Sequence, residues 1–520
     1  MPCRVKHVNK RTGVTYVYES VSYWDQEKKQ PRNKRVCIGK LDPESGKFIP
    51  SKRLAPEQSA VRDPVVTASA EVIGPSLILG ALSNRIGLDS LLKVCFPQLY
   101  QQILIMAYYL VSQGGPLSQC GTWCKSHAHH LKDSLSSQRI SEFLRTIQID
   151  EKQTFLSKWM SKVSGDDYLC YDITSISSYS EFNEYIKYGY NRDKEKLPQL
   201  NLAVLFSQKA GLPVYFQSLP GNITDVTTLH NLLKTFKALG MKALHYVMDK
   251  GFYSKKNISN LLLSRDKFIL PVPLNNKWVH HAIDDIYDVI HGPEGYRKID
   301  DEILYVHSRV YPWGKERRRC YLHLYYNPHK RAAAIDSFNE KLLKYKEELE
   351  LGKTIDDHKE AYEAFFIVKT TPKRGLKVSY NTQAVSQYIS RYAGFQAIIT
   401  NGTKDPVETL KIYRDKDVVE KCFDDLKNQL DMKRLRMHSS ATVGGRLFVQ
   451  FIALIIMSAL RKEMRSSGLI EKYTVRELIQ EMETLTKVKY SGKYGHILTE
   501  LTKQQREILK GLNITLPSKT

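Results

Sequence analysis

The sequence predicts a multidomain α/β (α+β) protein whose central mixed sheet is flanked by helices. Between about residues 166 and 273, short apolar runs bounded by turn residues predict five strands, at 168–173, 201–206, 213–219, 244–248 and 268–272. Helical periodicity lies between the later strands, at about 225–239 and 254–264. Three adjacent strands followed by helix, strand, helix and strand form a sheet of mixed type.

The chain is strongly basic. Its 520 residues contain 78 Lys and Arg against 55 Asp and Glu, which gives a formal net charge of +23. A polyanion is the natural partner of such a protein, and nucleic acid is the expected one. With 42% hydrophobic residues, the chain also has enough apolar material for several cores, which excludes a disordered protein.

Several other classes of protein are not expected. The eight cysteines are mostly scattered singly and the basic start, residues 1–7, has no apolar run, so a reducing cytoplasm is predicted. The longest apolar run, 447–460, is interrupted by Gln450 and is shorter than the roughly 18 residues of a membrane span, so we predict a buried helix. The Gly-Lys pairs lack the upstream glycine of a P-loop, which argues against ATP hydrolysis.

The pattern changes several times along the chain. Alternating residues at 14–23, with turn residues near Asp42 and Gly46, predict a small basic β module, and 135–144 predicts a Ser-capped helix in a region expected to contact DNA. The predicted segments are a β module at 1–60, a helical DNA-binding domain at 61–150, a core at 151–280, an insertion at 281–390, the second part of the core at 391–465 and a charged helical tail at 466–520.

Two of the predicted strands run into an aspartate, and a third carboxylate lies on a periodic helix. The first and fourth strands end at Asp172 and Asp249, and strand ends are where open sheets place their chemistry. A helix is predicted from about 406 to 431, after a last strand at 395–401. At about 100° per residue, its apolar stripe packs on the sheet and aims Glu420 toward the two aspartates.

Three converging carboxylates repel one another unless a cation compensates their charge. Mg²⁺ prefers oxygen ligands and keeps positions open for phosphate oxygens. Two such ions about 4 Å apart would serve an in-line displacement at phosphorus. Tyr413, Lys416 and Lys427 lie within about 40° of Glu420 on the predicted helix, and the two lysines are expected to pair with DNA phosphates.

The segment from Tyr413 to Lys427 resembles the Y-x2-R-x3-E-x6-K signature of bacterial insertion-sequence DDE transposases, with Lys416 in place of the arginine. Residues 172–179 and 248–254 resemble the strands that carry the two aspartates of that family, and Lys250 stands where an arginine usually follows the second. Both lysines keep the charge but lose the bidentate phosphate contact of arginine.

The resemblance implies a ribonuclease-H-like mixed sheet interrupted by a β-rich insertion. It also implies a metal-dependent DDE transposase that hydrolyses each transposon end and joins the released 3′ hydroxyl to target DNA. Asp172, Asp249 and Glu420 would be catalytic and would bind two Mg²⁺ ions, for which Mn²⁺ can substitute. Tyr413, Lys416, Lys427 and Lys250 would bind DNA. The partners implied are terminal inverted repeats, target DNA and a second copy of the chain in a homodimer, in a bacterial, nucleoid-associated cytoplasmic setting.

Other interpretations stay open. The fold also suits a nuclease without strand transfer, or a catalytically silent DNA-binding descendant of a transposase, and a hairpin step is not established by the residues. Asp424 and Asp431 share the predicted face of Glu420 and are rival third ligands. Lys416 and Glu420 also form an ordinary i,i+4 pair, and Tyr413 could serve packing alone. Cys120 and Cys124, near several histidines, match no common zinc spacing and are expected in a buried core.

Overall fold

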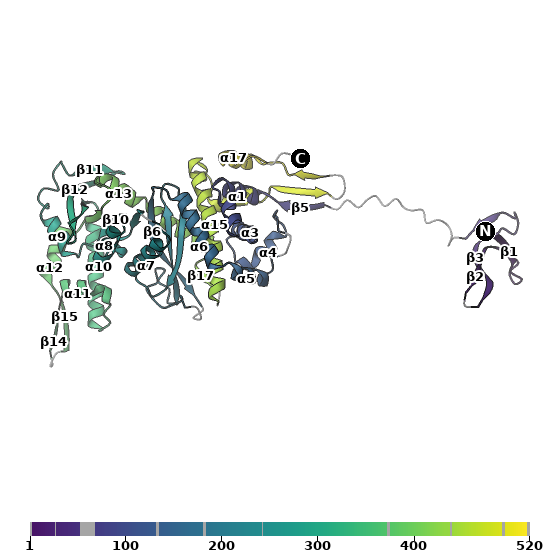
Figure 1. Ribbon diagram of the computed structural model, residues 1–520, viewed down its shortest axis with the longest axis horizontal. Helices are drawn as coiled ribbons and strands as arrows, with labels where there is room; N and C mark the ends of the chain where they lie inside the picture. Colours follow the sequence, from purple (N-terminus) through teal and green to yellow (C-terminus); the bar gives the residue numbers. More distant parts are fainter. Residues whose placement is uncertain are drawn as a thin grey trace. The chain divides into compact units, whose positions relative to one another are not determined.

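A ten-stranded sheet organises most of the chain in the computed structural model, with the order β11-β12-β13-β16-β10-β9-β6-β7-β8 and with β17 paired to β6 (Figure 1). The structure describes residues 3–516 except 27, 52–67, 132–134, 180–183, 242, 372–374, 437–438 and 491–494. Two compact units are present, residues 1–69 with 489–495, and residues 70–488 with 496–520. The boundaries of the six predicted segments stay predictions, and the one near residue 60 lies outside the described residues.

The middle of the sheet confirms the predicted strands. These are β6 (Tyr168–Ser178), β7 (Gln199–Ser207), β8 (Leu212–Pro220), β9 (His245–Met248) and β10 (Lys267–Val272). The first three pair antiparallel, whereas β9 is parallel to β6 and β10 is parallel to β9. Helices α7 (Asp225–Ala238) and α8 (Lys255–Leu263) make the crossovers. This is the predicted arrangement of a mixed sheet flanked by helices.

The predicted insertion is built into the same sheet. It contains α9 (Lys277–Asp284), β11 (Tyr296–Ile299), β12 (Glu302–Trp313), β13 (Arg318–Tyr326), α10 (Arg331–Glu350), η3 (Asp356–His358), α11 (Lys359–Phe365), β14 (Phe366–Thr371), β15 (Gly375–Tyr380), α12 (Thr382–Gln387) and the π-helix η4 (Tyr388–Tyr392). Strand β13 pairs with β16 (Phe395–Thr400), whose other edge pairs with β10. Residues of α10, α11 and the β14–β15 hairpin form a separate small core around Phe338 and Phe365.

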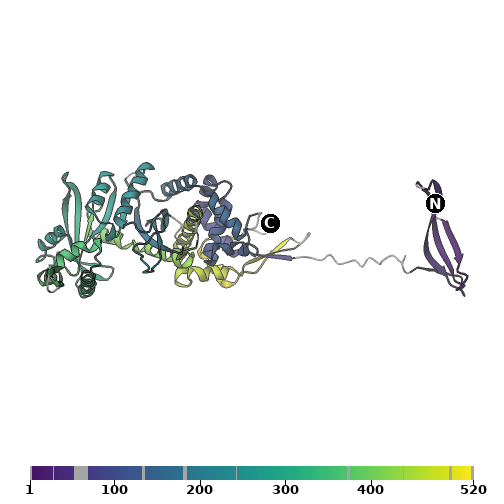
Figure 2. The same cartoon turned by 90° about the horizontal axis from the view of Figure 1, so that it is seen from below.

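A layer of helices covers the β8 side of the sheet. Its N-terminal members are α1 (Gly74–Arg85), α2 (Leu88–Cys95), α3 (Tyr100–Gln113), η1 (Leu117–Gln119), α4 (Cys120–Cys124), α5 (Ser137–Thr146) and α6 (Ile149–Val163). The long helix α15 (Ser440–Ser466) packs against α1, α3, α5 and β8 (Figures 1 and 2). The predicted Ser cap is present, because the Ser136 side chain accepts a hydrogen bond from the Arg139 backbone N–H.

Helix α15 confirms the predicted buried helix. It is long and apolar enough to cross a membrane, but 94% of its most apolar window is buried inside the protein. Gln450, which interrupts the apolar run, is also buried, and its amide donates a hydrogen bond to the Leu430 carbonyl. The polar interruption therefore joins α15 to the segment that carries Glu420.

The predicted continuous helix from 406 to 431 is wrong. The segment forms α13 (Pro406–Arg414), α14 (Asp417–Asp424) and the π-helix η5 (Asp425–Gln429), followed by β17 (Arg434–Leu435). Arg414 at the end of α13 pairs with Asp300 and Glu302 of the insertion, whereas α14 buries Val419 and Phe423 in the main core. A turn at Asp415 and Lys416 separates the two helices, and a π-helical turn follows the second.

The C-terminal segment contains more than the predicted helical tail. It comprises η6 (Leu469–Glu471), α16 (Val475–Met482), β18 (Thr486–Tyr490), β19 (His496–Leu498) and α17 (Lys503–Gly511), and its strands form a small sheet with β5 (Ala68–Val72). Leu478, Ile479 and Met482 are buried. These residues make α16 part of the helical layer.

The N-terminal unit confirms a small β module. Strands β1 (Cys3–Val8), β2 (Thr15–Asp25), β3 (Gln30–Leu41) and β4 (Phe48–Pro50) form an antiparallel sheet. The predicted turn is present between β3 and β4. The Asp42 carboxylate accepts hydrogen bonds from the backbone N–H groups of Glu44 and Ser45, and Gly46 has a φ of +64°.

Two adjacent glycines of α15 provide a matched test of its packing. A Cβ on Gly445 would lie 2.0 Å from the Leu144 carbonyl oxygen of α5, whereas a Cβ on Gly444 would meet only the Lys152 ammonium, at 3.0 Å. We expect Gly445→Ala to cost about 1–3 kcal/mol through overpacking. Gly444→Ala should be neutral or slightly stabilising, because alanine favours helix. Thermal melts of both variants check this, and equal melting temperatures would contradict the described contact.

Candidate active site

The pairing of β6 with β9 brings two aspartates side by side. These strands are parallel, with Tyr171 opposite Met248, and each of these residues is followed by an aspartate. Asp249 follows the end of β9, as predicted. Asp172, however, lies inside β6 and not at its end, because pairing with β7 continues as far as Ser177.

The two carboxylates differ in environment. Burial raises the pKa of Asp172 to about 6, although the Ile173 N–H, Lys416 and Arg192 partly oppose this shift. The negative charge of Asp249 adds to the rise. The side chain of Asp249 is 46% exposed. The site therefore pairs a partly buried acid that resists ionisation with a solvated carboxylate.

Lys416 lies among all three predicted catalytic carboxylates. Its Nζ is 3.2 Å from Glu420 Oε1 and 3.9 Å from Asp249 Oδ1, and its charge also acts on Asp172. Burial lowers the pKa of Lys416, but Asp249, Glu420 and Asp172 together raise it above its ordinary value. The structure thus places Asp249 and Glu420 beside one ammonium group whose charge also acts on Asp172, and Glu420 remains 60% exposed.

Tyr413 contributes to the same group from the preceding helix. Its hydroxyl donates a hydrogen bond of 3.0 Å to Asp249 Oδ1, and Lys416 Nζ lies 5.6 Å from the centre of its ring. Burial, reinforced by Asp249, raises the pKa of Tyr413 well above its ordinary value. Tyr413 therefore acts as a hydrogen-bond donor to Asp249 and is more than a packing residue.

The donor chemistry fits a hard divalent cation, but the carboxylates stand apart. Three carboxylates are the oxygen ligands that Mg²⁺ prefers. Across the described residues, no three His, Cys, Asp or Glu side chains lie close enough together to hold one metal ion. Lys416 instead supplies positive charge between the carboxylates, as its contacts with Glu420 and Asp249 show.

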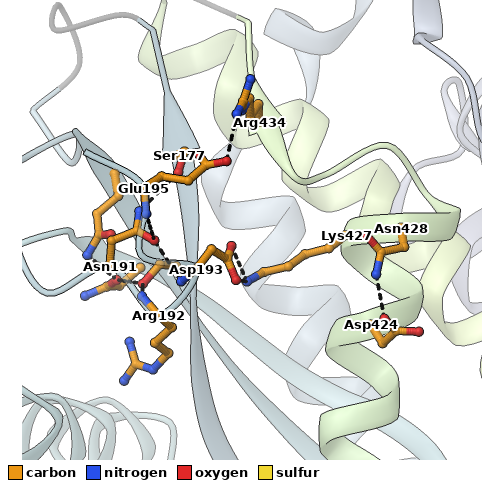
Figure 3. Close-up of polar contacts among 12 residues, drawn as sticks. Ser177, Asn191, Arg192, Asp193, Glu195, Asp424, Lys427, Asn428 and Arg434 are labelled. Carbon is orange, nitrogen blue, oxygen red and sulfur yellow. Dashed lines mark hydrogen bonds and ion pairs between the residues drawn. The ribbon is translucent and has the colours of Figure 1, made fainter. Parts of the chain in front are cut away.

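Lys427 does not lie on the face of Glu420. Because the chain turns as a π-helix after Asp424, Lys427 points toward the segment before β7 and its Nζ contacts both carboxylate oxygens of Asp193 at 2.7 Å (Figure 3). Its side chain is only 12% exposed. The prediction that Lys427 shares a helix face with Glu420 is wrong. A role for Lys427 at DNA stays a prediction.

The two rival third ligands are engaged elsewhere. Asp424 accepts a hydrogen bond of 2.5 Å from the Asn428 amide (Figure 3), and Asp431 pairs with Arg446 at 3.2 Å. Glu420 is the residue of the three that contacts Lys416. The geometry therefore favours Glu420.

Arg192 is a neighbour of the site that sequence reasoning missed. It lies before β7, pairs with Asp225 at 2.5 Å and lowers the pKa of Asp172 by its charge. No periodicity or motif marks this residue, because only the fold brings its loop toward β6. Lys250, in the short 3₁₀ helix η2 (Lys250–Phe252), was predicted as a DNA contact and is exposed directly after Asp249.

The Cys120–His130 region has no metal geometry. Cys120 is buried in α4, as expected for a core residue. The His127 ring stacks on Trp123 and shares a hydrogen bond of 2.6 Å with Glu483, and His129 bonds to the Cys124 carbonyl. These histidines serve structural contacts.

Comparison with known proteins places the chain in a family. A cryo-EM structure of a piggyBac transposase synaptic complex with hairpin DNA aligns over 79% of this chain and 76% of that one, with a TM-score of 0.37 and 9% identity. No curated protein matches the sequence. The family model for the transposase DDE domain matches residues 164–456, more than half of the chain. The protein therefore belongs to the DDE transposases, the enzymes that cleave DNA and transfer its strands in DNA transposition.

Proposed function

We propose that Asp172, Asp249 and Glu420 are the catalytic carboxylates of this transposase, which releases transposon ends and joins them to target DNA by a cut-and-paste reaction. The observation that carries the proposal is the arrangement of these three side chains around Lys416. Carboxylates from two sheet strands and one helix lie near one lysine there, although they repel one another. Such a cluster of acidic groups with a perturbed member is typical of a functional site.

Divalent metal ions are generally used by DDE transposases. We infer that Asp172, Asp249 and Glu420 hold two Mg²⁺ ions, or Mn²⁺ in their place, which when bound supply the charge that activates the attacking oxygen and stabilises the leaving one. Burial raises the pKa of Asp172 and the charge of Asp249 adds to the rise, so a cation bound beside these two carboxylates would favour the ionised form of Asp172. Tyr413 orients Asp249 through its hydrogen bond, and Lys416 limits carboxylate repulsion in the free protein.

A transposase binds DNA, and the residues around this site suggest how. We assign phosphate contacts to Lys250, Lys416 and Lys427, and a contact beside the cleaved bond to Tyr413. Lys250 is the lysine most available, since it is exposed and has no ion pair within the described part of the chain. We further propose that a homodimer holds two terminal inverted repeats, in the nucleoid-associated cytoplasm of a bacterium.

The first functional prediction concerns cleavage. Asp249→Ala and Glu420→Gln should each lower Mg²⁺-dependent nicking of a transposon-end duplex by orders of magnitude, because each removes one anionic oxygen ligand. Asp424→Asn is the matched control, since Asp424 lies one turn from Glu420 and bonds to Asn428. Nicking assays with Mg²⁺ and Mn²⁺ measure the effect.

Binding of the same duplex in EDTA should survive in all three variants, because none of them removes a cation. If Asp424→Asn loses nicking while Glu420→Gln retains it, the third ligand has been assigned to the wrong residue. A wild-type protein that binds ends but never nicks them would refute the proposed chemistry.

The second prediction concerns pH. The pKa of Asp172 is about 6 in the folded protein and near 3.9 in an unfolded chain, so the folded state binds the proton more tightly. The free energy of unfolding therefore falls as the pH rises from about 4 to 6, by about 3 kcal/mol at most. Asp172→Asn should lack this loss and should melt at a higher temperature than wild type above pH 6, with the difference vanishing below pH 4.

Melting curves in EDTA at pH 4, 6 and 8 test the effect, and Mg²⁺ at pH 8 tests its cause. The metal should stabilise wild type more than Asp172→Asn, because a ligand that binds only the folded state raises its stability. Parallel pH profiles for the two proteins would show that Asp172 does not carry the raised pKa.

The third prediction distinguishes Lys250 from Lys427 as contacts to DNA phosphates. Lys250→Gln should flatten the dependence of log Kd on log salt by about 0.9, the contribution of one phosphate contact. Lys427→Gln should leave the slope unchanged if its ion pair with Asp193 persists on DNA. Fluorescence anisotropy with one duplex over 50–200 mM salt provides the measurement, and the opposite ranking would reassign the phosphate contact to Lys427.

A further inference from the structure

A second basic feature lies away from the carboxylates, where the start of α15 meets α5 and β17. It is a pocket of about 510 Å³, which we name the arginine pocket. Four arginines line it together with a single acidic residue, namely Arg145, Arg434, Arg436, Arg446 and Asp431. The rest of its lining is largely serine, threonine and small apolar side chains. The lining therefore carries net positive charge.

Two of the four guanidinium groups are neutralised and two are not. Arg446 is buried and pairs with Asp431, and Arg434 pairs with Glu195 at 2.8 Å. Arg145 and Arg436 are both exposed and form no ion pair with any described residue. The Nε of Arg145 donates to the Thr442 hydroxyl at 3.2 Å, which holds its guanidinium at the pocket. Two positive groups are thus left for an anion.

The backbone adds to this charge. Ser439 and Thr442, which line the pocket, belong to the first turn of the 27-residue helix α15, and Ser439 makes no side-chain capping bond. Ser137 and Ser141 line the pocket from the start of α5. Guanidinium groups, hydroxyls and the N-terminal N–H groups of a helix are together the donors that phosphate takes.

The pocket is tied rigidly to the catalytic strand. Strand β17 is parallel to β6 and places Arg434 opposite Ser177, which lies five residues beyond Asp172. At about 3.3 Å per residue, Ser177 lies roughly 17 Å along the strand from Asp172. Figure 3 shows Glu195 and Asp193, in one short segment, reaching Arg434 and Lys427 respectively. Arg192, in the same segment, acts on Asp172 by its charge, so this segment lies near both the pocket and the candidate active site.

We propose that the arginine pocket binds phosphates of the DNA backbone outside the cleavage site. The proposal rests on the proposed function, since it takes the carboxylates as the point of cleavage.

The test uses the double variant Arg145→Gln with Arg436→Gln in the full chain. Its dependence of log Kd on log salt, measured by anisotropy with a 30-base-pair duplex in EDTA, should flatten by about 1.8, which is two phosphate contacts. The same relation gives a loss of affinity on the order of 50-fold at 0.1 M salt. Lys503→Gln with Arg506→Gln on α17 removes equal charge from another exposed surface and should leave the slope near the wild-type value.

An unchanged slope in the pocket variant, or an equal loss in the α17 variant, overturns the proposal. So does a pocket variant that loses binding of inorganic phosphate in calorimetry but binds the duplex normally, because the pocket then takes a free anion. If the double variant unfolds, Arg436→Gln alone should still flatten the slope by about 0.9.

Because these measurements contain no metal, they separate this proposal from the catalytic one. If the pocket variant loses DNA binding but wild type never nicks DNA, the pocket proposal stands and the catalytic proposal is refuted. If wild type nicks DNA normally but the salt slope of the pocket variant is unchanged, the catalytic proposal stands and the pocket proposal is refuted.

Discussion

The parallel pairing of β6 with β9 is the constraint on which the candidate site depends. Its register sets Tyr171 opposite Met248, and the two residues that follow are both acidic. Backbone hydrogen bonds thus hold two like charges together, against their own repulsion. The neighbouring groups compensate for this placement, with Lys416 and Tyr413 contacting Asp249 and the charges of Lys416 and Arg192 acting on Asp172.

The interruption between α13 and α14 determines how those neighbours reach the aspartates. Tyr413 ends the first helix and donates to Asp249, whereas Lys416 and Glu420 begin the second. The tyrosine hydroxyl and the lysine ammonium meet the same carboxylate from either side of this interruption. The apolar residues of the two short helices account for their burial. The polar groups of Tyr413 and Lys416, on either side of the break, both contact Asp249.

Much of this arrangement could be predicted from local sequence pattern. The five central strands, the two crossover helices and Asp249 lie where apolar periodicity and turn residues predict them, because each depends on its nearest neighbours in the chain. The positions of Lys427 and Arg192 could not be predicted in this way. Lys427 is redirected by a π-helical turn, and Arg192 approaches Asp172 through a loop distant in sequence. Contacts between residues distant in the chain form only in the folded protein, so the periodicity of the sequence does not predict them.

Strand β16 has a further consequence for the whole enzyme. Its two edges pair with β10 of the core and β13 of the insertion, so a single sheet runs through both. Removing the insertion would expose a row of unpaired backbone groups along β16, which favours aggregation. The insertion is therefore part of the central sheet and is not a separately folded domain joined by a linker. Because the sheet is continuous, a load that bound DNA places on the insertion also acts on the strands that carry the aspartates.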